Sequence, residues 1–159
     1  MSCAVVYYSL DGNTEFVART LAEKLEADPI RLTPEKEPPK GLGKMAVGGF
    51  QAIFQVDPKL PNMVAQMEPY DSVLIAFPIW AGTYPPAIGA LVDQGGLLGK
   101  SVYLVATSGS GNASRAFSTL RRKLGSVGVK DTLSLDAPLS KKDYTNDHID
   151  VWIRKNQLG

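Results

Sequence analysis

Polar and glycine residues gather in the segment that follows the first apolar run of the chain. This segment is Ser9-Leu10-Asp11-Gly12-Asn13-Thr14, and a helical pattern begins directly after it. Its hydroxyl and amide groups can donate hydrogen bonds, Gly12 lets the backbone turn tightly, and free N–H groups at a helix start favour an anion. These are the parts of a receptor for a phosphate monoester that requires no lysine or arginine. The alternative is that Asn13 or Thr14 only caps the helix.

Two later loops have a similar character. Pro78-Ile79-Trp80-Ala81-Gly82-Thr83 offers an indole that can stack on a flat ring, and Gly82 lets a backbone group rotate to meet a ring nitrogen. Thr107-Ser108-Gly109-Ser110-Gly111-Asn112 can present several backbone amides to a carbonyl-rich heterocycle. Taken singly, Trp80 could equally pack on a helix, Thr83 could cap one, and the third loop is an ordinary Gly/Ser turn. Together the three loops predict a phosphate pocket, a stacking face and a donor-rich wall.

Two other phosphate motifs do not fit. A P-loop requires a lysine after its second glycine, and the chain has no lysine between Met1 and Arg19. The glycines of residues 109–111 suggest a dinucleotide fingerprint, but Ser114 stands where the third Gly or Ala belongs. That segment also follows a late strand instead of opening the fold, so neither motif is supported.

The predicted elements bring the three loops to one place. Short apolar runs of about five residues suit strands covered on both faces, as in a parallel sheet. They lie at residues 4–8, 73–77 and 102–106, with weaker runs at 30–32 and 129–135. Helical spacing of apolar residues lies between or after them, at residues 17–25, 88–92, 113–124 and 144–155. This alternation predicts an α/β fold with a doubly wound parallel sheet of five strands and helices on both faces.

Ligands of such open sheets bind beyond the carboxyl ends of the strands, which is where each of the three loops begins. Segment 35–63 interrupts the regular alternation with four prolines and several glycines, and we expect a long crossover there that contains one short helix around the apolar patch 50–54.

Composition narrows the class of protein. The chain has 159 residues, of which 44% are hydrophobic and 21% charged, as expected for one globular domain spanning residues 1–159. A net charge of +1 gives no reason to expect nucleic acid as a partner. No apolar stretch approaches the roughly 20 residues that cross a bilayer, and no signal peptide is recognisable, so we expect a cytoplasmic protein without membrane insertion. The single cysteine, Cys3, suits a small core residue, and the single histidine, His148, a solvated surface.

In order and spacing, these loops resemble those of the flavodoxin family. Residues 9–14 resemble its FMN-phosphate loop, and residues 78–86 and 107–112 are similar to its two isoalloxazine loops, notably in short-chain members. The resemblance covers essentially the whole chain. It implies strand order 2-1-3-4-5, one non-covalent FMN, and low-potential electron transfer between redox protein partners, a reductase and an acceptor.

The resemblance also implies roles for individual residues. Ser9, Asp11, Gly12, Asn13 and Thr14 would surround the phosphate. Trp80 would cover one flavin face, Gly82 would lie near the reactive ring nitrogen, and residues 107–112 would line the pyrimidine end.

Three features depart from the family pattern. Asp11 stands where the family commonly has a hydroxyl, the chain is nearly neutral where electron-carrier flavodoxins are acidic, and the third loop has no aromatic to cover the second flavin face. Either Tyr84 or a residue of segment 35–63 covers that face, or it is open, and an open face would suit a hydride donor or a quinone. An FMN-dependent NAD(P)H or quinone reductase is therefore the alternative to the expected electron carrier. A third alternative is an interaction module of the same fold without flavin.

Overall fold

The strands of the sheet form where the apolar runs predict them. The computed structural model describes residues 2–35, 57–109 and 112–159. Its five-stranded sheet has the order β2-β1-β3-β4-β5, and every pairing is parallel. This order and the predicted α/β class are thereby confirmed. The strands are β1 Cys3–Tyr7, β2 Asp28–Arg31, β3 Ser72–Pro78, β4 Ser101–Ser108 and β5 Val129–Asp136.

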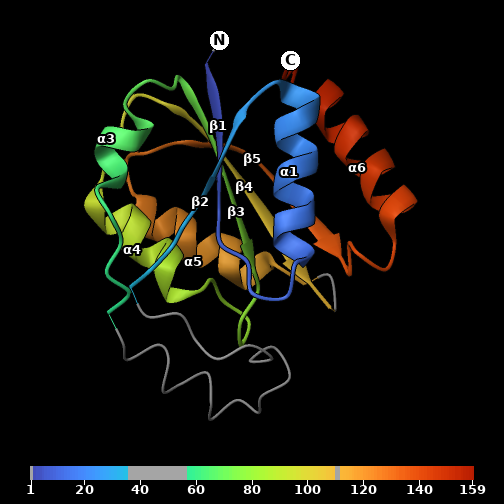
Figure 1. Ribbon diagram of the computed structural model, residues 1–159, viewed down its shortest axis with the longest axis horizontal. Helices are drawn as coiled ribbons and strands as arrows, with labels where there is room; N and C mark the ends of the chain where they lie inside the picture. Colours follow the sequence, from blue (N-terminus) through green and yellow to red (C-terminus); the bar gives the residue numbers. More distant parts are fainter. Residues whose placement is uncertain (1, 36–56, 110–111) are drawn as a thin grey trace.

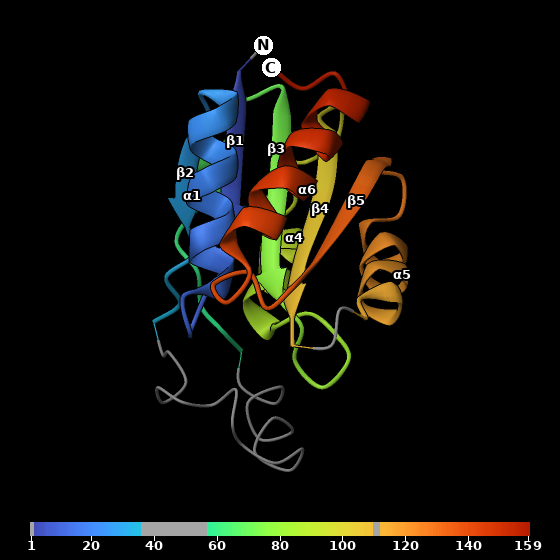
Figure 2. The same cartoon turned by 90° about the vertical axis from the view of Figure 1, so that its right-hand side faces the viewer.

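Helices cover both faces of the sheet (Figures 1 and 2). Helices α1 and α6 lie on one face, and α3, α4 and α5 lie on the other. Both termini lie at the end of the sheet opposite the tips of the β3 and β4 arrows (Figure 1). The helices are α1 Asn13–Leu25, α3 Met63–Met67, α4 Pro86–Gln94, α5 Ser114–Leu124 and α6 Lys142–Lys155.

The central strands are apolar along most of their length because both of their faces are covered. In β1, Val5 and Tyr7 belong to the core beneath α1 and α6, while Ala4 and Val6 belong to the core beneath α3, α4 and α5. All residues of β3 are buried. The hydrophobic effect thus fixes each strand between two helical layers and directs the loops at its carboxyl end toward solvent.

The element boundaries differ from the expected ones at a few places. Strand β2 occupies Asp28–Arg31 instead of residues 30–32, and it tolerates Pro29 because it is an edge strand. Helix α6 begins at Lys142, two residues earlier than expected. The expected crossover with a short helix at residues 50–54 falls on residues 36–56, outside the described residues. Its far end is visible, where Asn62 Oδ1 accepts a hydrogen bond of 3.2 Å from Ala65 N and caps α3.

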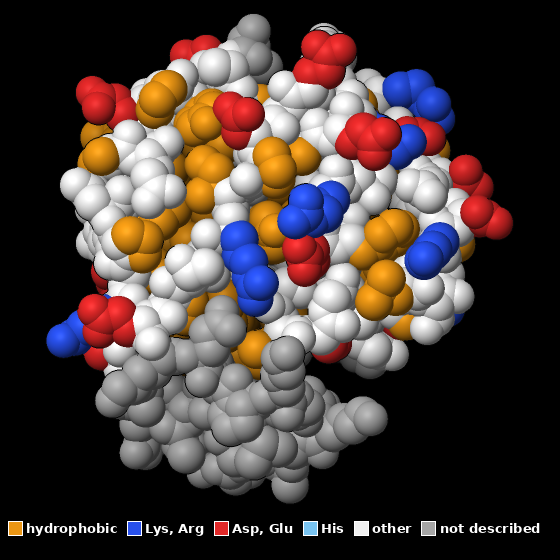
Figure 3. All heavy atoms as spheres, in the orientation of Figure 1, with side chains coloured by type: hydrophobic (Ala, Val, Ile, Leu, Met, Phe, Trp, Pro, Cys, Tyr) orange, Lys and Arg blue, Asp and Glu red, His pale blue; other side chains and the backbone are white. Residues whose placement is uncertain are grey.

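Charges of both signs are interspersed on the face of the molecule that Figure 3 shows. This distribution agrees with the near-zero net charge. In residues 2–35, 57–109 and 112–159, no helix is long and apolar enough to span a bilayer.

Candidate functional site

A pocket of about 450 Å³ lies at the carboxyl ends of the strands. This volume falls within the range of about 300–1,000 Å³ that is usual for small-molecule sites. Residues from all three predicted loops line it, and so do residues of the loop between β5 and α6. The lining residues are Asp11, Asn13, Pro78, Ile79, Trp80, Thr107, Ser108, Gly109, Ala137, Leu139 and Ser140.

The other described members of the predicted loops flank this lining. They are Ser9, Leu10, Gly12, Thr14, Ala81, Gly82, Thr83 and Asn112. The remaining two, Ser110 and Gly111, lie outside the described residues. The structure therefore brings the three loops together at one edge, as the sequence predicts, although which of these residues bind a ligand stays a prediction.

Gly12 forms the turn from β1 into α1. It is the N-cap of α1, with φ of 91°, a left-handed conformation that favours glycine. Because glycine has no side chain to cap the helix, the N–H groups of the first turn face the loop without a competing side chain from the N-cap position. The helix start therefore retains the anion-binding property for which the loop was singled out.

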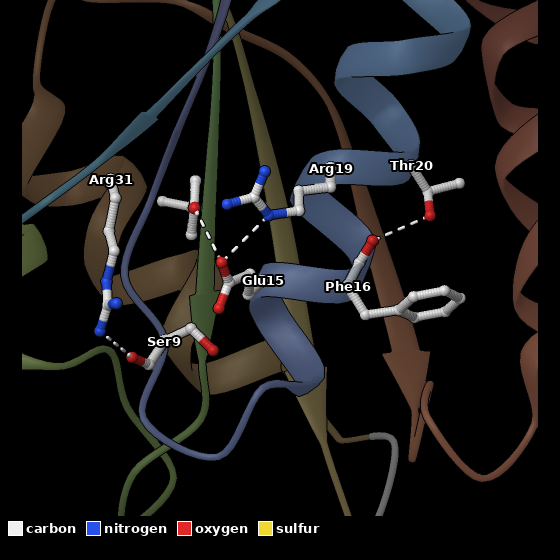
Figure 4. Close-up of polar contacts among 7 residues, drawn as sticks. Ser9, Glu15, Phe16, Arg19, Thr20 and Arg31 are labelled. Carbon is white, nitrogen blue, oxygen red and sulfur yellow. Dashed lines mark hydrogen bonds and ion pairs between the residues drawn. The ribbon is translucent and has the colours of Figure 1, made fainter.

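Ser9 is the buried member of this loop. Ser9 is 3% exposed, and its Oγ has no hydrogen-bond partner among the described residues. The backbone carbonyl of Ser9 accepts a hydrogen bond of 3.1 Å from Arg31 Nη2, whose side chain reaches it from β2, while the Ser9 hydroxyl turns away from Arg31 (Figure 4). Arg31 is thus a cation that steadies the loop, and no local sequence pattern indicates this contact.

Hydrogen bonds join Asp11 to Asn13, and Asn13 to the loop after β5. Asp11 Oδ1 accepts a hydrogen bond of 3.0 Å from Asn13 N, so the carboxylate occupies one of the N–H groups that an anion would use. Asn13 Oδ1 in turn accepts a hydrogen bond of 3.1 Å from Leu139 N. The Asn13 side chain therefore ties the first loop to the loop after β5.

Two buried hydroxyls join the first loop to the third. Thr14 Oγ1 and Thr107 Oγ1 lie 2.8 Å apart, and both residues are almost fully buried. Each hydroxyl satisfies the other, which fixes the start of α1 relative to the end of β4.

The Glu15 carboxylate in the first turn of α1 is paired with Arg19 at 3.0 Å (Figure 4). Burial and this carboxylate, which accepts a bond from the Tyr7 hydroxyl at 3.4 Å, raise the pKa of Tyr7. Tyr7 therefore stays neutral at physiological pH.

The second loop is a tight hairpin turn. Trp80 and Thr83 exchange both backbone hydrogen bonds, at 2.8 and 2.9 Å, and Ala81 and Gly82 between them have φ of 48° and 78°. Trp80 is 4% exposed and packs edge-on against Tyr8, with ring centroids 5.6 Å apart. The indole is thus both a core residue and a wall of the pocket, and its stacking on a ligand ring stays a prediction.

Arg115, in the first turn of α5, lies beside this turn. Its Cδ and Nη1 are each 3.9 Å from the point where a Cβ on Gly82 would stand. In the third loop, Ser108 and Gly109 line the pocket, while Asn112 Oδ1 accepts a bond of 3.3 Å from Ser114 N and caps α5. A guanidinium thus lies beside the hairpin turn whose Trp80 lines the pocket.

The wall formed by residues 137–140 was not predicted from the sequence. The signal was present, because these residues follow the fifth predicted strand and the same edge rule applies to them. Cys3 and His148, to which no role in the site was assigned, do lie away from the pocket. Cys3 is half-buried at the start of β1, where burial raises its pKa to about 11, and His148 is exposed on α6. In the described part of the chain, no three His, Cys, Asp or Glu residues gather into a potential metal site.

The strand order and the loop after β1 define a doubly wound α/β protein of the flavodoxin-like class, whose ligands bind at the switch point between β1 and β3. A family model described as Flavodoxin matches residues 52–156. The chain belongs to the flavodoxin family, as the resemblance predicted.

Solved structures agree with this assignment. A protein of Bacteroides uniformis ATCC 8492, described as a candidate flavoprotein, is 23% identical with a TM-score of 0.80, over 96% of this chain and 97% of that one. A flavoprotein of Lactobacillus acidophilus NCFM in complex with FMN is 21% identical with a TM-score of 0.69, over 88% and 97%. FerB of Paracoccus denitrificans, an NAD(P)H:(acceptor) oxidoreductase, is 17% identical with a TM-score of 0.56, over 99% and 98%. At these identities the likeness concerns the fold. A comparison with curated protein sequences finds no match.

Proposed function

We propose that this protein binds FMN at the carboxyl edge of its sheet and passes electrons through it. The phosphate would lie at the start of α1, and the ring system would lie between the loops after β3 and β4. Membership of the flavodoxin family supports FMN, as does the FMN complex of the Lactobacillus relative. The observation that carries the proposal is the buried hydroxyl of Ser9, which has no hydrogen-bond partner among the described residues.

A buried hydroxyl without a partner costs free energy, so native proteins rarely keep one without a reason. In the phosphate loop, a ligand oxygen would supply the missing partner. Gly12 and the first-turn N–H groups of α1 would add further donors to the same anion. Asp11 opposes binding electrostatically, so we expect its carboxylate to leave Asn13 N when the phosphate binds.

The bound FMN would supply the redox chemistry, which the side chains of the protein do not themselves perform. The tasks of the chain are to hold the phosphate through residues 9–14, to enclose the ring between residues 78–83 and 107–112, and to limit access of water. Near this loop, Tyr7 is neutral and the Glu15 carboxylate is paired with Arg19. Among the residues that line the pocket, Asp11 is the one that carries a carboxylate.

The test compares Ser9→Ala with Ser72→Ala. Ser72 Oγ is likewise buried and has no partner in residues 2–35, 57–109 and 112–159, but Ser72 begins β3 at the opposite end of the strands, which makes it a matched control. Binding of FMN and of riboflavin to the flavin-free protein is measured by quenching of flavin fluorescence, and stability by urea unfolding. We expect S9A to weaken FMN binding about tenfold, which corresponds to about 1.4 kcal/mol, and to leave riboflavin binding unchanged.

Neither substitution should lower the free energy of unfolding of the flavin-free protein by more than about 0.5 kcal/mol, because each removes an unsatisfied group. S72A should leave FMN affinity unchanged. A wild-type protein that does not bind FMN would refute the proposal and favour an interaction module without flavin. Equal FMN affinity in S9A and wild type would refute the role of Ser9.

For the role of the flavin, we propose electron transfer between protein partners, a reductase and an acceptor. An FMN-dependent NAD(P)H or quinone reductase is the second candidate. It is supported by the oxidoreductase FerB among the structural neighbours and by the Arg115 guanidinium beside Gly82. Anaerobic mixing of the FMN-loaded protein with NADPH or NADH separates the two. Rapid bleaching of the flavin absorbance without another protein identifies the reductase, and a stable oxidised spectrum identifies the carrier. A cytoplasmic location and a single domain stay predictions.

A further inference from the structure

The loop between β5 and α6 lies directly against the loop proposed to take the phosphate. Leu139 N donates the hydrogen bond of 3.1 Å to Asn13 Oδ1. The Cδ1 atom of Leu139 is 3.6 Å from the point where a Cβ on Gly12 would stand, which is van der Waals contact. An apolar side chain thus borders the phosphate end of the pocket.

This loop is anchored on its other side as well. Ala137 N donates a hydrogen bond of 2.8 Å to the carbonyl of Ser108, and Ser140 N donates one of 3.0 Å to the carbonyl of Ala137. The hydroxyl of the fully buried Thr145 donates to the carbonyl of Pro138 at 3.4 Å. Ala137 itself has φ of 42°, a strained conformation that persists only where its surroundings hold it. These contacts make residues 137–140 a fixed wall.

A wall at this place limits what can follow a first phosphate. A mononucleotide ends with its phosphate monoester, whereas a dinucleotide such as FAD continues into a second phosphate and an adenosine. Leu139 provides no hydrogen-bond donor from its side chain, and it lines the pocket directly beside Gly12, where such an extension would have to pass the first phosphate loop. The nearby Lys141 is ion-paired with Asp136, so its charge is already neutralised.

We propose that Leu139 is a specificity-determining residue, which closes the phosphate end of the pocket and selects a flavin mononucleotide over FAD. The proposal rests on the FMN binding proposed above. Leu139 is 39% exposed, so a smaller side chain at this position should lose little packing and leave the sheet unchanged.

The experiment measures the dissociation constants of FMN and of FAD for the flavin-free wild type, Leu139→Ala and Leu139→Gly by fluorescence quenching. Leu98→Ala is the matched control, because Leu98 is a loop leucine, 74% exposed, just before β4 at the opposite edge of the sheet. We expect the preference of the wild type for FMN to fall at least about tenfold in L139G and less in L139A. The gain should come from tighter FAD binding, with FMN affinity changed less than about threefold. L98A should retain the wild-type preference.

The outcomes separate this inference from the proposed function. If the wild type binds FMN and L139G keeps the same preference, Leu139 does not determine specificity. If the wild type binds FAD as tightly as FMN, the pocket is not closed at this end. If the wild type binds neither flavin, the proposed function fails and this inference fails with it. Thermal unfolding of each variant confirms that it is folded, and L139A, the milder change, tests the same trend if L139G is destabilised.

Discussion

Replacing Asp11 should strengthen FMN binding, although Asp11 lies within the phosphate loop. Its carboxylate lines the pocket and accepts the hydrogen bond from Asn13 N. A phosphate that binds at the start of α1 must displace this carboxylate and then remain close to its charge. Asp11→Asn retains an oxygen acceptor of the same shape without the charge, and Asp11→Ala removes both.

The size of the effect follows from the exposure of Asp11. Because the side chain is exposed, the repulsion is felt through a water-like medium. A single charge about 6 Å from a dianion then costs about 1.4 kcal/mol, or about tenfold in the dissociation constant. At an ionic strength of about 0.15 M, screening reduces this to about threefold. Loss of the competing hydrogen bond in D11A contributes about 0.5–1.5 kcal/mol more.

The assay is a titration of flavin-free protein with FMN, followed by fluorescence quenching at low and at high salt. Glu23→Gln is the control, because this substitution also removes one negative charge. Glu23 is exposed on α1, about 15 Å beyond the start of that helix. The D11N gain should be largest at low salt and should exceed that of E23Q. If D11N binds FMN no more tightly than wild type at low salt, or if E23Q matches it, the repulsion argument is wrong.

Two further predictions concern stability. The buried hydroxyls of Thr14 and Thr107 are hydrogen-bonded to one another, so T14V and T107V should each lower the free energy of unfolding by about 1–2 kcal/mol. Measured by urea unfolding, the double variant should lose less than the sum of the two single losses. Strict additivity would contradict this pairing. Burial alone raises the pKa of Asp131, but hydrogen bonds from Lys155 and Asn156 outweigh it and lower the pKa to about 2. The carboxylate therefore stabilises the fold above its unfolded pKa of about 3.9 and loses this effect as the pH falls toward 2. D131N should cost about 1 kcal/mol at pH 7 and almost nothing at pH 2, a difference that unfolding curves at the two pH values would detect.

Regular structure and the meeting of the three loops at one edge of the sheet were predictable because both depend on local patterns. Continuous apolar runs identified β1, β3 and β4, since a strand covered on both faces leaves no room for polar residues. Apolar spacing along the chain identified α1, α5 and α6 in the same way. The rule that ligands bind beyond the carboxyl ends of parallel strands then placed the three loops at one edge. The strand order came from the family resemblance.

The contacts within the site were not predictable, because they join residues far apart in sequence. Asn13 was expected to face a phosphate, yet its side-chain oxygen accepts a bond from Leu139, 126 residues away. Asp11 was singled out as a departure from the family pattern, but the sequence did not indicate that its carboxylate accepts a hydrogen bond from Asn13 N. For Trp80 the sequence left packing and stacking equally open, and the structure shows that it packs on Tyr8 while it also lines the pocket.

The sequence by itself determined which segments become strands and helices, and which loops meet at the ligand edge of the sheet. Hydrophobic periodicity and backbone conformation act over a few residues, so they leave a readable local pattern. Only the tertiary structure decided which polar atoms are paired there: Thr14 with Thr107, Asn13 with Leu139, and Ser9 with no partner among the described residues. Those pairings depend on strand register and on the packing of helices across the sheet, which bring residues about 90 or more positions apart within 3.1 Å.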